Sequence, residues 1–269
     1  MKDNSQPLVS VVMGTYNGSR WIVRAIDSIL NQSYSNLELI ICDDASIDNT
    51  LQLITKRASK DRRLIIVRNE INSGLNISLN KCIDVAQGKY IARMDDDDIS
   101  LPNRLELQVN FLENHPEYVL VGCGMRFFDE DGIWGQRIAK TCPTTADIFK
   151  SRAFSHPTVM MRHKALAEVG YYSTDKLNRR GQDYDLWCKF YCAGYKGSNL
   201  PEPLLDYYES KSSIARRKLK FRIDHIRKQL LWRQRLGLPL YFLLFPLLDS
   251  LKCIVPKALY RAIRIQKYK

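Results

Sequence analysis

The sequence predicts an α/β protein whose central sheet is mostly parallel and carries helices on both faces. Short apolar, β-branched runs alternate with helix-like stretches over the first hundred residues. Parallel strands need a crossover connection, which is usually a helix, so this alternation is typical of a parallel sheet. Polar clusters also follow three of the predicted strands, at the sheet edge where open α/β proteins bind their ligands.

The first half of the chain contains four apolar runs that predict strands, at residues 8–13, 37–42, 64–67 and 89–94. Helices are expected between them, at residues 19–32, 46–60 and 74–86. Ser19 is the expected N-cap of the first helix. Gln87 and Gly88 are expected to end the third helix.

The second half has a more mixed pattern after Pro102. Helices are expected at residues 104–114 and 183–193, and strands at residues 118–124, 125–128 and 158–161. Residues 129–155 show no readable pattern. The basic stretch at residues 212–236 has helical periodicity.

Three polar clusters follow strand ends: the turn around Thr15 and Asn17, the pair Asp43 and Asp44, and the run of aspartates at 95–98. We expect them to converge on one crevice, because parallel strands end at the same edge. Four adjacent carboxylates repel one another, and a hard divalent cation such as Mg²⁺ or Mn²⁺ would relieve this repulsion. The alternative is a solvated acidic turn that caps a helix.

Other site classes lack their motifs. The adjacent aspartates have no glycine-centred loop, which excludes an EF-hand, and neither GxxxxGK nor GxGxxG follows the first strand. The seven cysteines form no CxxC pair, and the four histidines lack HExxH spacing, so a zinc site is not expected. Reduced thiols and a polar N-terminus predict a cytosolic protein without a signal peptide.

The net charge of +12 is concentrated at the C-terminus. Residues 210–269 carry 16 Lys and Arg against 2 Asp and Glu, whereas residues 1–209 have a net charge of −2. The apolar run at residues 236–248 is too short to span a membrane and contains two prolines. A basic amphipathic segment of this kind favours attachment to an anionic membrane surface, with packing on the domain as the alternative. Nucleic-acid binding is disfavoured because the body is not basic.

Four segments resemble the family 2 inverting glycosyltransferases with the GT-A fold, whose central sheet is Rossmann-like. They are residues 8–50 (containing VSVVMGTYNG), 69–108 (containing RMDDDD), 156–162 (HPTVMMR) and 180–187 (RGQDYDLW). The resemblance covers roughly residues 7–208. It implies a catalytic domain at 1–208, with a nucleotide-sugar half up to about residue 100 and an acceptor half at 101–208. Residues 209–269 would form the membrane-associating tail.

The resemblance also implies roles for residues of the first half. Asp44 would hydrogen-bond the base, typically uracil. Asp95 and Asp97 match the aspartates of the DxD signature and would bind Mn²⁺ or Mg²⁺. The nucleotide site is expected to comprise Thr15, Asn17, Asp44, Asp95 and Asp96.

In the second half, the resemblance assigns the general base to Asp183. Gln182 stands where the family usually has an acidic residue, which changes the electrostatic neighbour of that base. Asp98, His156 and Trp187 are candidates for acceptor binding, with core burial an open alternative for Trp187 and a structural turn an open alternative for His156. For Arg93 an ion pair is expected, and for Arg104 a solvated helix face or a salt bridge.

The implied reaction is transfer of one sugar from a UDP-sugar to a hydroxyl group with inversion, so that an α-linked donor gives a β-linkage. A bound cation neutralises the leaving diphosphate, and a carboxylate removes the proton of the attacking hydroxyl. The expected acceptor is a polyprenyl-diphosphate-linked saccharide of a bacterial surface polysaccharide, at the cytoplasmic face of the membrane. Alternatives are a sugar-phosphate nucleotidyltransferase and a non-catalytic lipid- or nucleic-acid-binding protein. The oligomeric state stays open.

Overall fold

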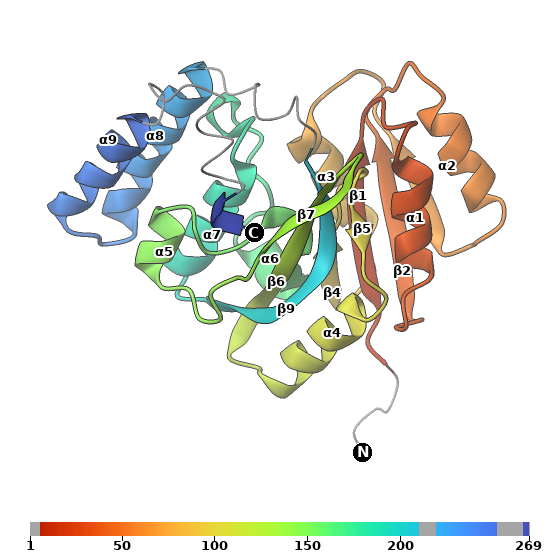
Figure 1. The fold of residues 1–269 in the computed structure, drawn as a ribbon, viewed down its shortest axis with the longest axis horizontal. Coiled ribbons are helices and arrows are strands. Elements are labelled where there is room, and N and C mark those ends of the chain that lie inside the picture. The colour runs from red at the N-terminus through yellow and green to blue at the C-terminus, as the bar shows by residue number, and fades with distance from the viewer. Residues whose placement is uncertain (1–5, 210–218, 252–265, 269) are drawn as a thin grey trace.

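A computed structural model describes residues 6–209, 219–251 and 266–268 of the chain. In these ranges, nine strands form one sheet in the order β3-β2-β1-β4-β8-β6-β9-β5, and β7 pairs with β6. Helices cover both faces of this sheet (Figure 1). The expected α/β architecture is therefore confirmed.

The described elements have the following bounds. The strands are β1 (Val9–Thr15), β2 (Leu37–Asp43), β3 (Leu64–Arg68), β4 (Tyr90–Arg93), β5 (Ile99–Ser100), β6 (Tyr118–Asp129), β7 (Gly132–Arg137), β8 (Met160–Arg162) and β9 (Lys196–Tyr208). The α-helices are α1 (Ile22–Leu30), α2 (Thr50–Ala58), α3 (Leu75–Val85), α4 (Arg104–Asn114), α5 (Thr145–Phe149), α6 (His163–Glu168), α7 (Gln182–Cys192), α8 (Leu219–Arg235) and α9 (Leu244–Leu251). Short 3₁₀ helices are η1 (His156–Thr158), η2 (Lys176–Asn178) and η4 (Leu240–Leu243).

Strand β1 lies inside the parallel half of the sheet. Val9 is the register partner of Leu37 on β2 and of Tyr90 on β4. Val11 packs in the core on one side of the sheet and Val12 in the core on the other, as the alternation of side chains along a strand requires. Burial on both faces explains why this strand reads as a continuous apolar run.

Two hydrophobic cores lie on opposite sides of the sheet. One is built with α1, α2 and α4, which contribute residues such as Ile26, Ile54 and Leu105. The other is built with α3, α5, α6 and α7, together with Trp232 of α8. The chain therefore positions its strand ends on a scaffold that is packed from both sides.

The second half of the sheet is mixed. β8 runs antiparallel to both β4 and β6, while β9 runs parallel to β6. The sequence does not predict β9, because Pro201 and Pro203 interrupt it and proline removes a ladder donor. The β6–β9 ladder shifts register beside these prolines, between Cys123 and Gly124. The two strands expected at 118–124 and 125–128 are one continuous strand, β6.

Several local expectations differ from the structure. Ser19 does not cap α1, because Trp21 occupies the N-cap and makes no side-chain capping bond. α2 begins at Thr50, later than the expected residue 46. Of the unpredicted elements β5, β7, α5 and α6, the helix α5 carries a readable signal, since Thr144 and Asp147 form a reciprocal capping box.

The described part of the C-terminal region packs on the domain. In α8, the side chains of Lys228, Gln229 and Trp232 are buried, and the Gln229 amide donates to the backbone oxygen of Phe149 at 3.1 Å. Figure 1 shows α8 and α9 side by side at the end of the molecule away from α1 and α2. Expected helical residues 212–218 lie outside the described residues. Within the described ranges, no helix has the length and apolar character needed to cross a membrane.

Candidate active site

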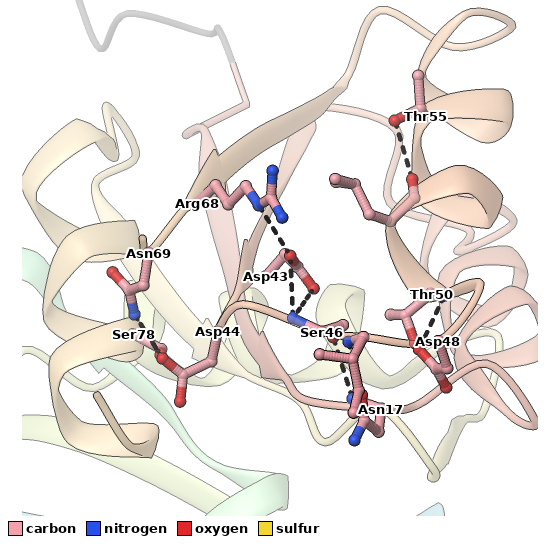
Figure 2. Close-up of polar contacts among 12 residues, drawn as sticks. Asn17, Asp43, Asp44, Ser46, Asp48, Thr50, Thr55, Arg68, Asn69 and Ser78 are labelled. Carbon is pink, nitrogen blue, oxygen red and sulfur yellow. Dashed lines mark hydrogen bonds and ion pairs between the residues drawn. The ribbon is translucent and has the colours of Figure 1, made fainter. Parts of the chain in front are cut away.

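Asn17 joins the loops that follow β1 and β2. Its backbone N–H donates to Ser46 Oγ at 3.0 Å, and its side-chain Oδ1 accepts from the N–H of Ile47 at 3.0 Å (Figure 2). Asn17 has φ 55°, a left-handed conformation that asparagine tolerates better than most residues. The two predicted polar turns are thus held together at one edge of the sheet.

Asp44 is the anchor of the loop that leads into α3. Its carboxylate is 4% exposed and accepts from Asn69 Nδ2 at 2.7 Å, as Figure 2 shows. The backbone N–H groups of Ser73 and Gly74 each donate to it at 2.8 Å. Gly74 has φ 93°, which favours glycine at this turn. The predicted contact between Asp44 and a nucleotide base stays a prediction.

Asp96 points toward the end of β1. Thr15 Oγ1 donates to Asp96 Oδ2 at 2.5 Å. A Cβ on Gly18 would lie 2.3 Å from the same Asp96 oxygen, so a side chain at position 18 would force the Asp96 side chain to shift. Burial raises the pKa of Asp96 to about 6. Thr15 and Asp96, both predicted for the nucleotide site, are therefore direct partners.

Asp95, Asp97 and Asp98 form an acidic cluster in which the candidate ligand oxygens all lie within 4.8 Å of one another. Burial, followed by the charges of Asp95 and Asp96, raises the pKa of Asp97 to about 7. Burial and the charges of Asp95 and Asp97 raise the pKa of Asp98 well above its ordinary value. Burial and mutual repulsion make it unfavourable for these carboxylates to be charged together. Mg²⁺ and Mn²⁺ prefer carboxylate oxygens as ligands, so the cluster fits a hard divalent cation.

Asp98 differs from its expected role. We expected it to face the sugar or the acceptor, but it is fully buried, and its Oδ1 accepts from the backbone N–H of Tyr208 at 2.9 Å. Its Oδ2 is buried and has no hydrogen-bond partner among the described residues. Because Tyr208 lies on the unpredicted strand β9, the sequence held no signal for this orientation. The structure places Asp98 in the acidic cluster.

Two buried arginines support this loop. Arg93 forms the expected ion pair, with Asp95; burial opposes its charge, but the contact raises the pKa of Arg93 above its ordinary value. The expectation of a solvated face or a salt bridge for Arg104 is wrong, because this side chain is fully buried and donates to the backbone oxygens of Arg93 at 3.2 Å and Pro157 at 3.0 Å. Burial lowers the pKa of Arg104 to about 10, so it stays charged at neutral pH. Arg104 therefore ties the end of β4 to η1.

A cleft of about 700 Å³ brings the two halves of the site together. Its walls include Asp95 from the acidic cluster, His156 from η1 and Asp183 from α7. A neighbouring hollow of about 170 Å³ shares Leu75 and Arg179 with it and is also lined by Ser73 and Gly74, the residues that Asp44 anchors. Asp95 and Asp183 therefore share one cleft, and the loop that Asp44 anchors borders it, whereas Thr15, Asn17 and Asp44 are not among the lining residues of this cleft.

Asp183 lies in the first turn of α7, one residue after the helix begins at Gln182. Both side chains are partly exposed and line the cleft. The preceding Gly181 has φ 76°, a left-handed conformation that turns the chain into the helix. Gln182, the departure from the family pattern, thus borders the same space as the predicted base.

The two aromatic candidates for acceptor binding have different positions. His156 lines the cleft, and its Nε2 lies 2.8 Å from the hydroxyl of Tyr172. Burial and, to a smaller degree, the charge of Arg93 lower the pKa of His156 well below its ordinary value, so the ring is neutral. Trp187 is 4% exposed and packs against Phe154 with ring centroids 5.5 Å apart. Of the two readings of Trp187, core burial is the one that the structure supports.

Three further arginines line the cleft and are not among the predicted site residues: Arg137 at the end of β7, and Arg179 and Arg180 before α7. Arg180 is the first residue of the segment 180–187 that carries the Asp183 motif, and Arg179 directly precedes it, so their position in the sequence is a signal that could have indicated them. Arg137 has no such signal, because β7 itself is not predicted.

A family model described as Glycosyl transferase family 2 matches residues 10–180. The putative glycosyltransferase EpsE of Bacillus subtilis (strain 168) is 41% identical over 256 residues, which cover 95% of this chain and 92% of EpsE. WfaP of Escherichia coli is named a UDP-Glc:alpha-D-GlcNAc-diphosphoundecaprenol beta-1,3-glucosyltransferase. It is 28% identical over 214 residues, which cover 79% of this chain and 82% of WfaP.

A crystal structure of residues 1–349 of S. aureus TarS in complex with UDP-GlcNAc has the same fold. The TM-score is 0.69 at 21% sequence identity, and the match covers 83% of this chain and 66% of the TarS chain. This likeness, together with the family match, confirms the expected GT-A fold.

Proposed function

The chain belongs to glycosyl transferase family 2, and from this premise we propose that it transfers a single sugar from a UDP-sugar to a hydroxyl of a saccharide acceptor, with inversion. The observation that carries the proposal is the shared cleft: Asp95 of the acidic cluster and Asp183 of α7 line one space of about 700 Å³. A carboxylate cluster that fits a cation and a separate carboxylate for proton transfer are the two groups that a direct displacement needs.

The proposed roles follow from these positions. Asp95, Asp97 and Asp98 would hold Mn²⁺ or Mg²⁺, which would neutralise the charge on the departing nucleoside diphosphate. Asp183 accepts the proton of the acceptor hydroxyl as it attacks the anomeric carbon. One attack from the side opposite the leaving group inverts the configuration, so an α-linked donor gives a β-linked product. No observation in the described residues favours a nucleotidyltransferase or a non-catalytic binding protein.

The proposed acceptor is a saccharide linked to a polyprenyl diphosphate in bacterial polysaccharide synthesis. Arg137, Arg179 and Arg180 line the cleft and provide positive charge for a diphosphate. The name of WfaP specifies an acceptor of this kind, and TarS was crystallised with a UDP-sugar. A lipid-linked acceptor requires an enzyme at the membrane surface, so we propose peripheral attachment at its cytoplasmic face.

A donor screen with two variants tests the proposal. With a synthetic lipid-diphosphate sugar and Mn²⁺, the protein should transfer one sugar from one of a set of UDP-sugars, as measured by product mass. Asp183→Asn should lower kcat about 10²- to 10⁴-fold, the usual contribution of a general base, and keep the affinity for UDP with Mn²⁺. Asp97→Ala should lose the metal-dependent part of UDP affinity in calorimetry.

Asp84→Asn, which changes an exposed aspartate on α3, is the control and should keep full turnover. EDTA should stop the reaction and added Mn²⁺ should restore it. Normal turnover by Asp183→Asn would refute its role as the base. UDP binding to Asp97→Ala that responds to Mn²⁺ as in the unchanged protein would refute the metal site.

A further inference from the structure

Lys228 of α8 reaches the start of α7 from outside the segment that the family model matches. It is 1% exposed. Its Nζ donates to the backbone oxygen of Arg180 and, at 3.2 Å, to that of Gly181. These two residues immediately precede Gln182 and Asp183. A side chain from the C-terminal region therefore holds the backbone that presents the proposed base.

This position is unfavourable for a lysine in two respects. Burial lowers the pKa of Lys228, although the carboxylates of Asp183 and Asp185 oppose that change. The N-terminus of a helix also carries a partial positive charge, which disfavours a cation there. Lysine is seldom buried unless its charge is well compensated. Here the two carbonyl oxygens and the two nearby aspartates supply the compensation.

The junction is built closely around Lys228. Gly181 has φ 76°, and a Cβ at this position would lie 2.6 Å from Lys228 Nζ. Among the described residues, no side chain caps the N-terminus of α7. One turn further along α8, Trp232 Nε1 donates to Asp185 Oδ1 at 3.1 Å. α8 thus holds the first turn of α7 at two points, one on each side of Asp183.

We propose that Lys228 is a positioning residue for Asp183, and that α8 is in this way a working part of the active site. The inference rests on the proposed role of Asp183 as the general base. A base must lie within hydrogen-bond reach of the attacking hydroxyl, and a misplacement of about 1 Å costs on the order of 100-fold in rate. Lys228 prevents such a displacement by pinning the two backbone carbonyls that precede the first turn.

The test replaces Lys228 with methionine in the full-length protein, which keeps most of the side-chain volume and removes the donor. We expect kcat to fall about 10- to 100-fold, with the donor KM and the affinity for UDP with Mn²⁺ within about twofold of the unchanged protein. A purely structural defect would instead lower the fraction of molecules that bind UDP. The binding stoichiometry in calorimetry separates the two cases.

Lys189→Met is the matched control. Lys189 lies in the last turn of α7. Its Nζ donates to the backbone oxygen of Tyr171 at 3.0 Å and lies 3.6 Å from Asp185 Oδ2. Like Lys228, Lys189 donates to a backbone carbonyl, but this carbonyl belongs to Tyr171 and does not precede Asp183. Its loss should therefore leave kcat within about twofold of the unchanged protein. If Lys228→Met does not fold, Gly181→Ala disturbs the same junction from the other side and should show the same fall in kcat.

The outcomes distinguish the inference from its premise. Normal kcat in Lys228→Met or Gly181→Ala, with Asp183→Asn inactive, would overturn the role of Lys228 and leave the proposed function intact. An equal loss of kcat in Lys189→Met would also overturn it, because the effect would then not be specific to this junction. Normal turnover in Asp183→Asn would overturn the premise itself.

Discussion

At the scale of single residues, the site is built from buried polar groups that hold one another in place. Asp44 accepts from two backbone N–H groups and from Asn69, and Thr15 donates to Asp96. Buried polar groups are costly unless they find partners, so each of these contacts restricts the loops to one arrangement. Asp98 Oδ2 is one of the buried atoms that have no hydrogen-bond partner among the described residues, and a bound cation would satisfy it.

His156 gives a prediction for the pH dependence of stability. Its pKa is lowered well below the ordinary value by burial, so the folded protein keeps the ring neutral where the unfolded chain, with a pKa of about 6.5, binds a proton. Stability should therefore fall as the pH drops below about 6.5, by about 1.4 kcal/mol between pH 7.5 and 5.5 from this group. Urea unfolding at the two pH values measures it.

His156→Gln serves as the comparison, since glutamine can keep a hydrogen bond to Tyr172 and does not titrate. Between pH 7.5 and 5.5, the variant should lose less stability than the unchanged protein, and the difference between the two losses should be about 1.4 kcal/mol. The other three histidines are common to both proteins and cancel in the difference. An identical pH dependence in the two proteins would show that the buried ring is not the cause.

At the scale of elements, α8 belongs to the domain rather than to a separate tail. Trp232 packs in the same core as Trp187 and Leu186 of α7. In η4, Phe242 meets Phe149 of α5 with ring centroids 5.5 Å apart. The boundary expected near residue 208 therefore marks the end of the sheet, while the hydrophobic core continues into α8.

Trp232→Ala tests this placement. Trp232 is 5% exposed and donates to Asp185, so its loss should destabilise the protein by about 3–5 kcal/mol, as for other buried aromatic side chains. Leu231→Ala is the neighbouring control: Leu231 is 46% exposed, and a change of about 0.5 kcal/mol or less is expected. The free energy of unfolding of each variant, measured in urea, gives the two effects. Equal effects of the two substitutions would mean that α8 does not pack on α7.

At the scale of the whole molecule, the excess positive charge and a set of exposed apolar side chains fall in the same part of the sequence. Residues 210–269 carry the excess positive charge. In the same part of the sequence, exposed apolar side chains gather on η4 and α9, and they include those of Leu240, Tyr241, Leu244 and Leu248. Figure 1 places these helices at one end of the molecule. Apolar side chains flanked by basic residues are what peripheral binding to an anionic membrane requires.

The double substitution Leu244→Asp and Leu248→Asp should weaken binding to phosphatidylglycerol vesicles by more than about tenfold, because both leucines lose apolar contact and both aspartates are repelled. Turnover of a short, water-soluble acceptor should not change. The matched control is Ile133→Asp with Ile138→Asp, two exposed positions at and beyond β7. Vesicle sedimentation measures the binding. Unchanged binding by the α9 variant, or an equal loss in the control, would contradict the proposed surface.

The sequence by itself determined the parallel half of the sheet, the family and the convergence of its polar clusters. These features are encoded locally: a strand buried on both faces reads as an apolar run, and a polar cluster directly follows its strand. Even there, helix starts such as that of α2 were misplaced, since the residues before it form the loop that contacts Asn17.

Only the tertiary structure decided which way the side chains of the site face. Asp98 meets Tyr208, which is 110 positions away, and Lys228 meets Gly181, which is 47 positions away. The buried Arg104 donates to backbone oxygens. Every residue has a backbone oxygen, so no pattern of residue types predicts these contacts. β9 is a strand because β6 and β5 pair with it, despite its prolines. Contacts between segments distant along the chain carry no local periodicity, and for that physical reason they emerge only once the chain is folded.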